Sequence, residues 1–346
     1  EVAIFSEKAY RKVTRHLEAM PSDYIKLFIY KDHIDFEQTN IIPEVITEGI
    51  GGFTEVFKDR IVLPIVTSPK RLEEVITHEF THRIQFEILY GGFGKSYKLI
   101  KSVFVPLWVM EGMPEYEAED YDPSITDMLI RDAVINDRIK DIDYLSSFNY
   151  FDGRDAVLLY KESQKIFEFI AKKYGHEKIG LILKEFEKFS TTTDTALTKI
   201  LGVNSKELNE EWQYDLKVKW WGEVKDKKEA KDYGKPLTFD TKEKLVFNTK
   251  LNFGSKSDKI YFLSDRGNYT GIYELSVGNF NVNEIMGNKY ESISASGNAL
   301  SVSKDGRYLA FAGKIGGNQK IYIYGLNENR IIYEFNNDLD LVYSPS

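Results

Sequence analysis

The spacing of apolar residues changes along this chain, and that change constrains its fold more than any other feature. In residues 1–220 apolar positions recur at the helical period over long stretches, with short strands predicted at 24–30 and 60–67. In residues 235–346 short alternating stretches are separated by Gly, Asn, Asp and Ser, which is typical of antiparallel strands. Residues 221–234, rich in lysine and acidic residues, are typical of a linker. The sequence therefore predicts a multidomain chain, with a mainly helical α+β domain followed by an all-β region.

Composition excludes several classes of function. Acidic residues outnumber basic ones, 54 to 46, and the formal net charge of the 346 residues is −8. Non-specific nucleic-acid binding depends on a basic surface, so no nucleic-acid partner is expected. No stretch approaches the run of about 20 apolar residues that a membrane-spanning helix needs. The chain has no cysteine, which removes disulfides, thiolate metal ligands and cysteine nucleophiles.

A metal-binding pattern lies within a stretch of helical periodicity, where residues 78–82 are H-E-F-T-H. On a helix, positions four apart lie roughly 40° apart around the axis, so His78 and His82 can reach one zinc ion. Glu79 projects beside them, where it can accept a proton from a zinc-activated water. It falls within the apolar arc of the helix, where a carboxylate without a partner is costly. An ion pair between Glu79 and Arg83, four residues on, is the alternative role for this carboxylate.

A third ligand is expected in a second helical stretch. A catalytic zinc with two histidine ligands takes a third protein ligand and keeps one position open. Glu111, 29 positions after His82, can supply that ligand, and Glu115 would share its helix face and hydrogen-bond a ligand histidine. Pro114 lies between the two glutamates. A helix that begins near Met113 accommodates this proline in its first turn, whereas a longer helix places it in the interior, where proline is disfavoured.

Residues 78–82, followed by L-W-V-M-E-G-M-P-E-Y at residues 107–116, resemble the gluzincin zinc metallopeptidases, specifically the MA-like peptidase family. The resemblance spans most of residues 20–220. It implies a zincin-like fold in which the two histidines and Glu111 bind zinc and Glu79 is the general base. It also implies a peptide or protein substrate, and export to the periplasm or the outside of a bacterial cell.

The resemblance supplies one further candidate and a preference among peptidases. Tyr160 begins a downstream helix at roughly the place where related enzymes carry a tyrosine, so it is the candidate donor to the oxyanion. Aminopeptidase relatives grip a free amino terminus with a Gly-x-Met-Glu-Asn segment, whereas residues 51–55, in a comparable region, are G-G-F-T-E. An endopeptidase is therefore predicted. The other histidines, His16, His33 and His176, are expected at the surface or at helix ends.

The β-rich region carries a weak internal repeat. Two pairs of segments recur at an offset of 49 positions, residues 260–262 with 309–311 and residues 272–273 with 321–322. A shared offset for two strand pairs indicates repeated four-stranded units such as propeller blades.

The same region resembles TolB-like propellers through residues 258–267 and 303–307. A closed propeller has about four to eight blades, and only two can be counted here. An incomplete propeller is therefore predicted over residues 235–346, with a surface open to a protein partner.

A second class of function stays open at this point. The protein could be a non-catalytic binding or scaffolding module, with zinc as a structural ion and the propeller as its interaction surface. Glu79 distinguishes the two hypotheses, because hydrolysis needs a general base and a structural zinc site does not.

Overall fold

The structure is a computed structural model. It describes residues 1–31, 35–36, 38–39, 51–55, 60–65, 68–91, 105–119, 122–147, 156–188, 191–229, 232–238, 246–254, 258–267, 270–286, 292–293, 300–315 and 318–335. The chain divides into two compact units, Glu1–Lys227 and Lys228–Ser346. No helix in the described ranges is long and apolar enough to cross a lipid bilayer.

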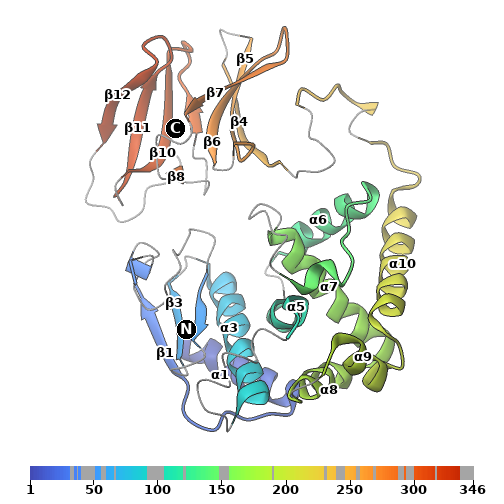
Figure 1. The fold of residues 1–346 in the computed structure, drawn as a ribbon. Helices are drawn as coiled ribbons and strands as arrows, with labels where there is room; N and C mark the ends of the chain where they lie inside the picture. Colours follow the sequence, from blue (N-terminus) through green and yellow to red (C-terminus); the bar gives the residue numbers. More distant parts are fainter. Residues whose placement is uncertain are drawn as a thin grey trace. The chain divides into compact units, whose positions relative to one another are not determined.

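The first unit is mainly helical and contains one small sheet (Figure 1). Its helical elements are α1 (Val2–Leu17), α3 (Pro69–Tyr90), α5 (Leu107–Ala118), α6 (Pro123–Ile135), the 3-10 turn η1 (Tyr144–Ser146), α7 (Ala156–Tyr174), α8 (Glu177–Phe186), α9 (Thr193–Leu201) and α10 (Ser205–Val224). Its strands are β1 (Lys26–Tyr30), β2 (Phe53–Glu55) and β3 (Arg60–Pro64). The mainly helical character predicted for this part of the chain is therefore confirmed.

The strand order in this sheet is β1-β3-β2, with β3 parallel to β1 and antiparallel to β2. The apolar run of the central strand β3 is buried, with Ile61 2% exposed and Val62 and Leu63 fully buried. Helix α3 packs against both β2 and β3. The sheet therefore covers one side of α3.

Helix α3 begins where the local sequence favours a helix start. The Ser68 hydroxyl accepts a hydrogen bond from the Arg71 backbone N–H at 3.4 Å, and Pro69 occupies the first helical position, where its missing N–H costs nothing. The sheet, α1 and α5 all pack against this helix. As a result polar residues of α3 are buried together with the apolar ones, among them Glu79, Thr81 and Gln85.

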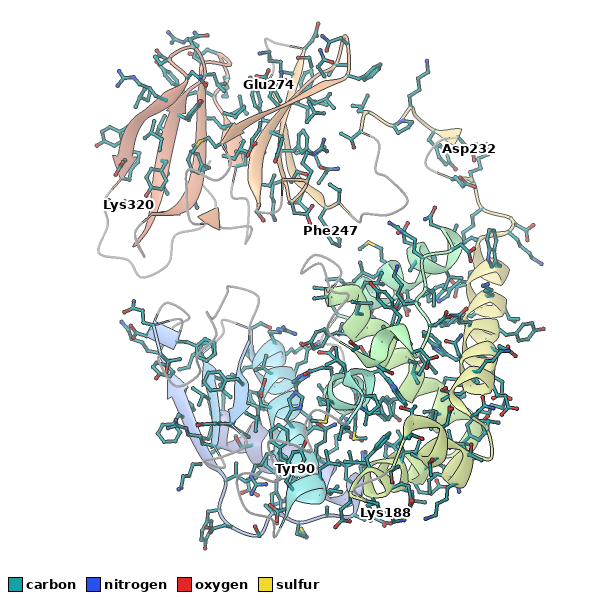
Figure 2. The ribbon with its side chains drawn as sticks, in the orientation of Figure 1. Tyr90, Lys188, Asp232, Phe247, Glu274 and Lys320 are labelled. Atoms are coloured by element: carbon teal, nitrogen blue, oxygen red, sulfur yellow. The ribbon has the colours of Figure 1, made fainter. Side chains whose placement is uncertain are left out.

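Helix α5 lies between α3 and α7 (Figure 1), and side chains fill the space among the three (Figure 2). Gly112 permits the close approach of α5 to α7. A Cβ atom at this position would lie 2.6 Å from the backbone carbonyl carbon and oxygen of Ser163. The glycine next to Glu111 therefore has a packing role.

We expect Gly112→Ala to destabilise the first unit by about 1–3 kcal/mol, because the methyl group meets backbone atoms that cannot rotate away. Gly222→Ala is a matched control, since Gly222 is also helical but has no atom within 4 Å of an added Cβ. The control should be neutral, or stabilising by up to about 1 kcal/mol from helix propensity. Urea unfolding followed by far-UV circular dichroism measures both, and equal stability of the two variants would contradict the packing argument.

The second unit is built from antiparallel strands. The strands are β4 (Asn248–Phe253), β5 (Lys259–Ser264), β6 (Gly271–Ser276), β7 (Asn281–Met286), β8 (Ser292–Ile293), β9 (Leu300–Val302), β10 (Tyr308–Ile315), β11 (Asn318–Gly325) and β12 (Arg330–Phe335). One sheet has the order β4-β5-β6-β7, and the other has the order β12-β11-β10-β8 with β9 also paired to β10. The all-β character predicted for this region is confirmed.

The two sheets share a core that includes Leu263 and Ile272 from the first sheet and Phe311 and Tyr322 from the second. The repeated segments fall on corresponding strands, β5 with β10 and β6 with β11. The described residues of the second unit form these two antiparallel sheets and no closed barrel or propeller. The propeller therefore stays a prediction.

Candidate metal centre

Helix α3 places the two histidines of the 78–82 motif one turn apart. Their ring centroids are 4.9 Å apart, with an interplanar angle of 75°. Both side chains are largely shielded from solvent, with 16% of His78 and 11% of His82 exposed. The helix therefore presents two partly buried imidazoles side by side.

Glu111 on α5 completes a three-residue cluster. Its Oε2 atom lies 3.7 Å from Nε2 of His78 and 3.4 Å from Nε2 of His82. Two tetrahedral ligands, each about 2.0–2.1 Å from a zinc ion, are about 3.3 Å apart. The observed spacings are close to that value, and all three donor atoms lie within 4.8 Å of one another. Two imidazoles and one carboxylate therefore fit a single metal ion.

The second ring nitrogen of each histidine has a partner, which fixes the orientation of the ring. Nδ1 of His78 lies 3.2 Å from Glu115, and Glu115 is itself paired with Lys161 on α7. Nδ1 of His82 lies 3.0 Å from Oε1 of Gln85, while Nε2 of Gln85 donates to the Val109 carbonyl at 3.1 Å. The sequence prediction included Glu115 but missed Gln85, whose position three residues after His82 on the same helix was the available signal.

Pro114 lies in the interior of α5, because this helix begins at Leu107 and not near Met113. The alternative in which the proline occupies the first turn is therefore wrong. Glu115 nevertheless contacts His78 at 3.2 Å. A proline inside the helix therefore does not prevent Glu115 from contacting His78.

Glu79 is buried, with 5% of its surface exposed, and it is held from the sheet side. The Thr54 hydroxyl on β2 lies 2.7 Å from Glu79 Oε2 and 2.8 Å from the Glu79 carbonyl oxygen. Gly52 leaves room for this side chain, since an added Cβ would come within 3.1 Å of the Glu79 Cγ atom. Arg83, proposed as an ion-pair partner, pairs with Glu87 at 2.8 Å. Sequence reasoning did not identify Thr54, which is distant from Glu79 in the chain.

Tyr160 lies in the first turns of α7 and is partly buried. Burial raises the pKa of its phenol well above the ordinary value, and the negative charges of Glu111, Glu115 and Glu79 raise it further. The structure therefore brings this hydroxyl into the electrostatic field of the three carboxylates. A phenol in this environment stays protonated and can donate a hydrogen bond.

The electrostatics of the cluster favour a cation. Burial lowers the pKa of His78, but hydrogen bonds to Glu111 and Glu115 outweigh it and raise this pKa to about 10. Burial raises the pKa of Glu111, but the charges of His82 and His78 hold it far below its usual range. The pKa of Glu115 falls to about 2, because His78 and Lys161 outweigh burial. A proton on His78 thus balances these carboxylates, and a divalent cation can take its place.

Two of the remaining histidines lie at helix ends and close to one carboxylate. His16, near the end of α1, and His176, which directly precedes α8, lie close to Glu117 and to each other. His33 lies outside the described residues. Within the described parts of the chain, two groups of at least three His, Asp or Glu side chains could hold a metal ion. They are His78–His82–Glu111 and His16–Glu117–His176.

Comparison with known families gives a match that covers most of the first unit. The family model described as the Peptidase MA superfamily matches residues 6–218, well over half of the chain. The matched range contains α3, α5 and α7, which carry the cluster around His78. A comparison with curated proteins found no match.

Proposed function

The chain belongs to the Peptidase MA superfamily, and from this premise we propose that it is a zinc-dependent peptidase, with endopeptidase preferred over aminopeptidase activity. Family membership supports a metallopeptidase-like function. The observation that carries the proposal is the convergence of His78, His82 and Glu111 from two helices, at spacings close to those of ligands around one ion. Two imidazoles and one carboxylate are a donor set that zinc accepts, and a fourth position stays open for the reaction.

Glu79 is the proposed general base. Zinc, when bound, supplies Lewis acidity that polarises the scissile carbonyl and acidifies the attacking water. The Glu79 carboxylate accepts the proton of that water and passes it to the leaving amine. The Thr54 hydroxyl, 2.7 Å from Glu79 Oε2, orients the carboxylate for this transfer. The burial of Glu79 and its contact with Thr54 are consistent with a catalytic group held in position.

Tyr160 is the proposed donor to the oxyanion. Its raised pKa keeps the phenol protonated throughout the range in which peptidases work, so the hydroxyl can stabilise negative charge on the carbonyl oxygen. The carboxylates whose charges contribute to this shift are the proposed ligand Glu111, its neighbour Glu115 and the proposed base Glu79.

We expect Tyr160→Phe to lower kcat by about 100-fold or more, the usual effect of losing one oxyanion donor, while zinc content stays unchanged. Tyr174→Phe is the matched control, because Tyr174 lies at the far end of the same helix and hydrogen-bonds Glu211. Steady-state cleavage of a quenched fluorogenic peptide measures the effect. Equal turnover in both variants would remove Tyr160 from the mechanism.

Metal removal tests the proposed function as a whole. Treatment with a chelator followed by dialysis should abolish cleavage of casein or of a quenched peptide, and added Zn²⁺ should restore it, whereas Mg²⁺ should not because imidazole ligands suit zinc. The measurement is the initial rate before removal, after removal and after each addition. Undiminished cleavage by protein shown to be free of metal would contradict a zinc peptidase.

A further inference from the structure

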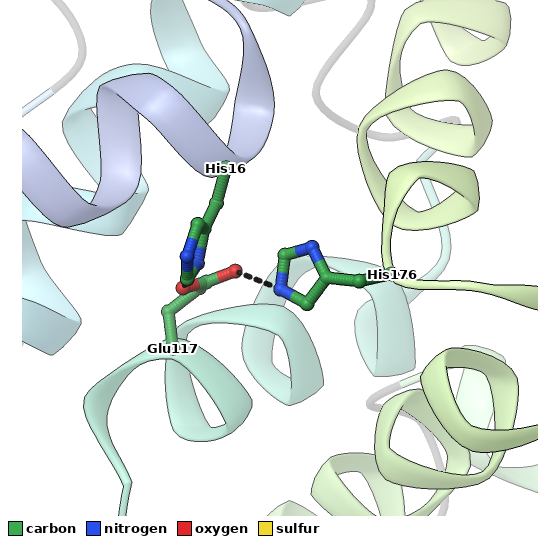
Figure 3. Close-up of side chains that lie close together, drawn as sticks. All are labelled: His16, Glu117 and His176. Carbon is green, nitrogen blue, oxygen red and sulfur yellow. Dashed lines mark hydrogen bonds and ion pairs between the residues drawn. The ribbon is translucent and has the colours of Figure 1, made fainter.

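A second cluster of two histidines and one glutamate lies away from the motif at residues 78–82. It joins His16 of α1, Glu117 of α5 and His176 at the start of α8 (Figure 3). The three donor atoms lie within 4.8 Å of one another, and the two imidazole centroids are 4.3 Å apart. The donor set is the same as in the cluster around His78, although no local sequence motif connects the three residues.

Glu117 is the central residue of this second cluster, and its side chain is fully buried. Oε2 is 2.8 Å from Nδ1 of His16, which is a hydrogen-bond distance. Oε1 is also buried but has no hydrogen-bond partner among the described residues. Nε2 of His176 is 3.6 Å from this oxygen, too far for a hydrogen bond. A buried carboxylate oxygen without such a partner is costly, so the hydrogen-bond network here is incomplete.

The 3.6 Å separation between Glu117 Oε1 and His176 Nε2 is close to the spacing of about 3.3 Å expected for two ligands of one tetrahedral zinc ion. A cation between the three side chains would satisfy Oε1 and replace the hydrogen bond from His16. Figure 3 shows His16 and His176 facing the Glu117 carboxylate from different sides. The geometry thus suits a shared ion better than it suits a pair of hydrogen bonds.

The second cluster borders a surface groove through His16. The groove has a volume of about 850 Å³, and its lining includes Glu73 and Glu119 as well as the basic residues Arg11 and Arg15. Lys12, another basic residue of this groove, donates from Nζ to the Glu117 backbone carbonyl at 2.7 Å. Lys12 is also paired with Glu119, which balances its charge.

We propose that His16, Glu117 and His176 form a second binding site for a divalent transition-metal ion of the zinc class, which ties α1 and α5 to the start of α8. Imidazole and carboxylate donors select zinc-like ions over magnesium or calcium. A site that draws its ligands from three separate elements stabilises the folded chain when occupied, because the unfolded chain does not hold these ligands together. The inference does not depend on the proposed peptidase activity.

The test is the zinc stoichiometry of the full chain, measured by elemental analysis after chelation, reloading with Zn²⁺ alone and dialysis. Wild type should hold two equivalents, and His176→Gln and His16→Gln should each hold one, with zinc affinity at the second site reduced by more than about 100-fold. Tyr116→Phe should hold two, since Tyr116 packs 5.7 Å from the His176 ring but offers no ligand to the cluster. In the absence of metal, matching melting temperatures for the four proteins would show that the substitutions act on the site and not on folding.

The double variant His78→Gln/His82→Gln separates this inference from the proposed function. It should retain one equivalent, which the further substitution His176→Gln removes. Unchanged stoichiometry in the double variant would contradict the peptidase site while leaving the second site intact. Equal stoichiometry in wild type, His16→Gln and His176→Gln would overturn the second site, and would leave His16 and Glu117 as a buried hydrogen-bonded pair.

Discussion

Glu79→Gln should lower kcat by about 100- to 10,000-fold, the usual range for losing a general base, while leaving the zinc content unchanged. Glutamine has nearly the same shape, and its amide oxygen can still accept the hydrogen bond that Thr54 donates to Glu79. The neutral amide cannot take a proton from water at neutral pH. The substitution therefore removes the proton acceptor and keeps the size and shape of the side chain.

Glu87→Gln is the matched control for this prediction. Glu87 lies on the same helix and pairs with Arg83, but it belongs to neither of the two possible metal clusters. Cleavage of a quenched peptide and zinc content are measured on the same preparations. Zinc bound in wild type and in Glu79→Gln, with no cleavage by either against a broad peptide library, would instead favour the scaffolding hypothesis with a structural metal.

Glu111→Gln should weaken zinc binding by more than about 100-fold, because it replaces the only charged ligand of the proposed site with a neutral amide. Glu115→Gln should have the smaller effect, about 10- to 100-fold, since Glu115 contacts the ligand His78 and is not itself a proposed zinc ligand. The ordering of the two variants follows directly from the positions of the two carboxylates in the structure.

The measurement is competition for Zn²⁺ against a chromophoric chelator. It is made in a His176→Gln background, so that the second cluster does not contribute to the signal. Equal losses in Glu111→Gln and Glu115→Gln would show that Glu111 is not a direct ligand. Wild-type affinity in Glu111→Gln would remove it from the site altogether.

The sequence predicted those parts of the site that are marked by a helical spacing or by a motif of the family it resembles. His78 and His82 are four apart on one helix, and Glu111 was found through the second motif. The structure brings their donor atoms together across α3 and α5. The change of period near residue 220 likewise predicted a helical part followed by antiparallel strands, because both periodicities are properties of local sequence.

The parts that sequence reasoning missed depend on contacts between distant segments. Thr54 meets Glu79 only because β2 pairs with β3 and α3 packs on that sheet. The His16–Glu117 contact joins residues 101 positions apart. The helix start that decides the place of Pro114 also depends on tertiary packing, because α5 begins without a side-chain cap. Neither spacing nor composition encodes such pairs.

The most direct test of the central claim is a crystal structure of the zinc-loaded protein, with anomalous diffraction measured on both sides of the zinc absorption edge. The expected result is a zinc peak about 2.0–2.2 Å from Nε2 of His78, Nε2 of His82 and a carboxylate oxygen of Glu111. A zinc-containing crystal in which these three side chains are well ordered and no zinc peak lies among them would contradict the account.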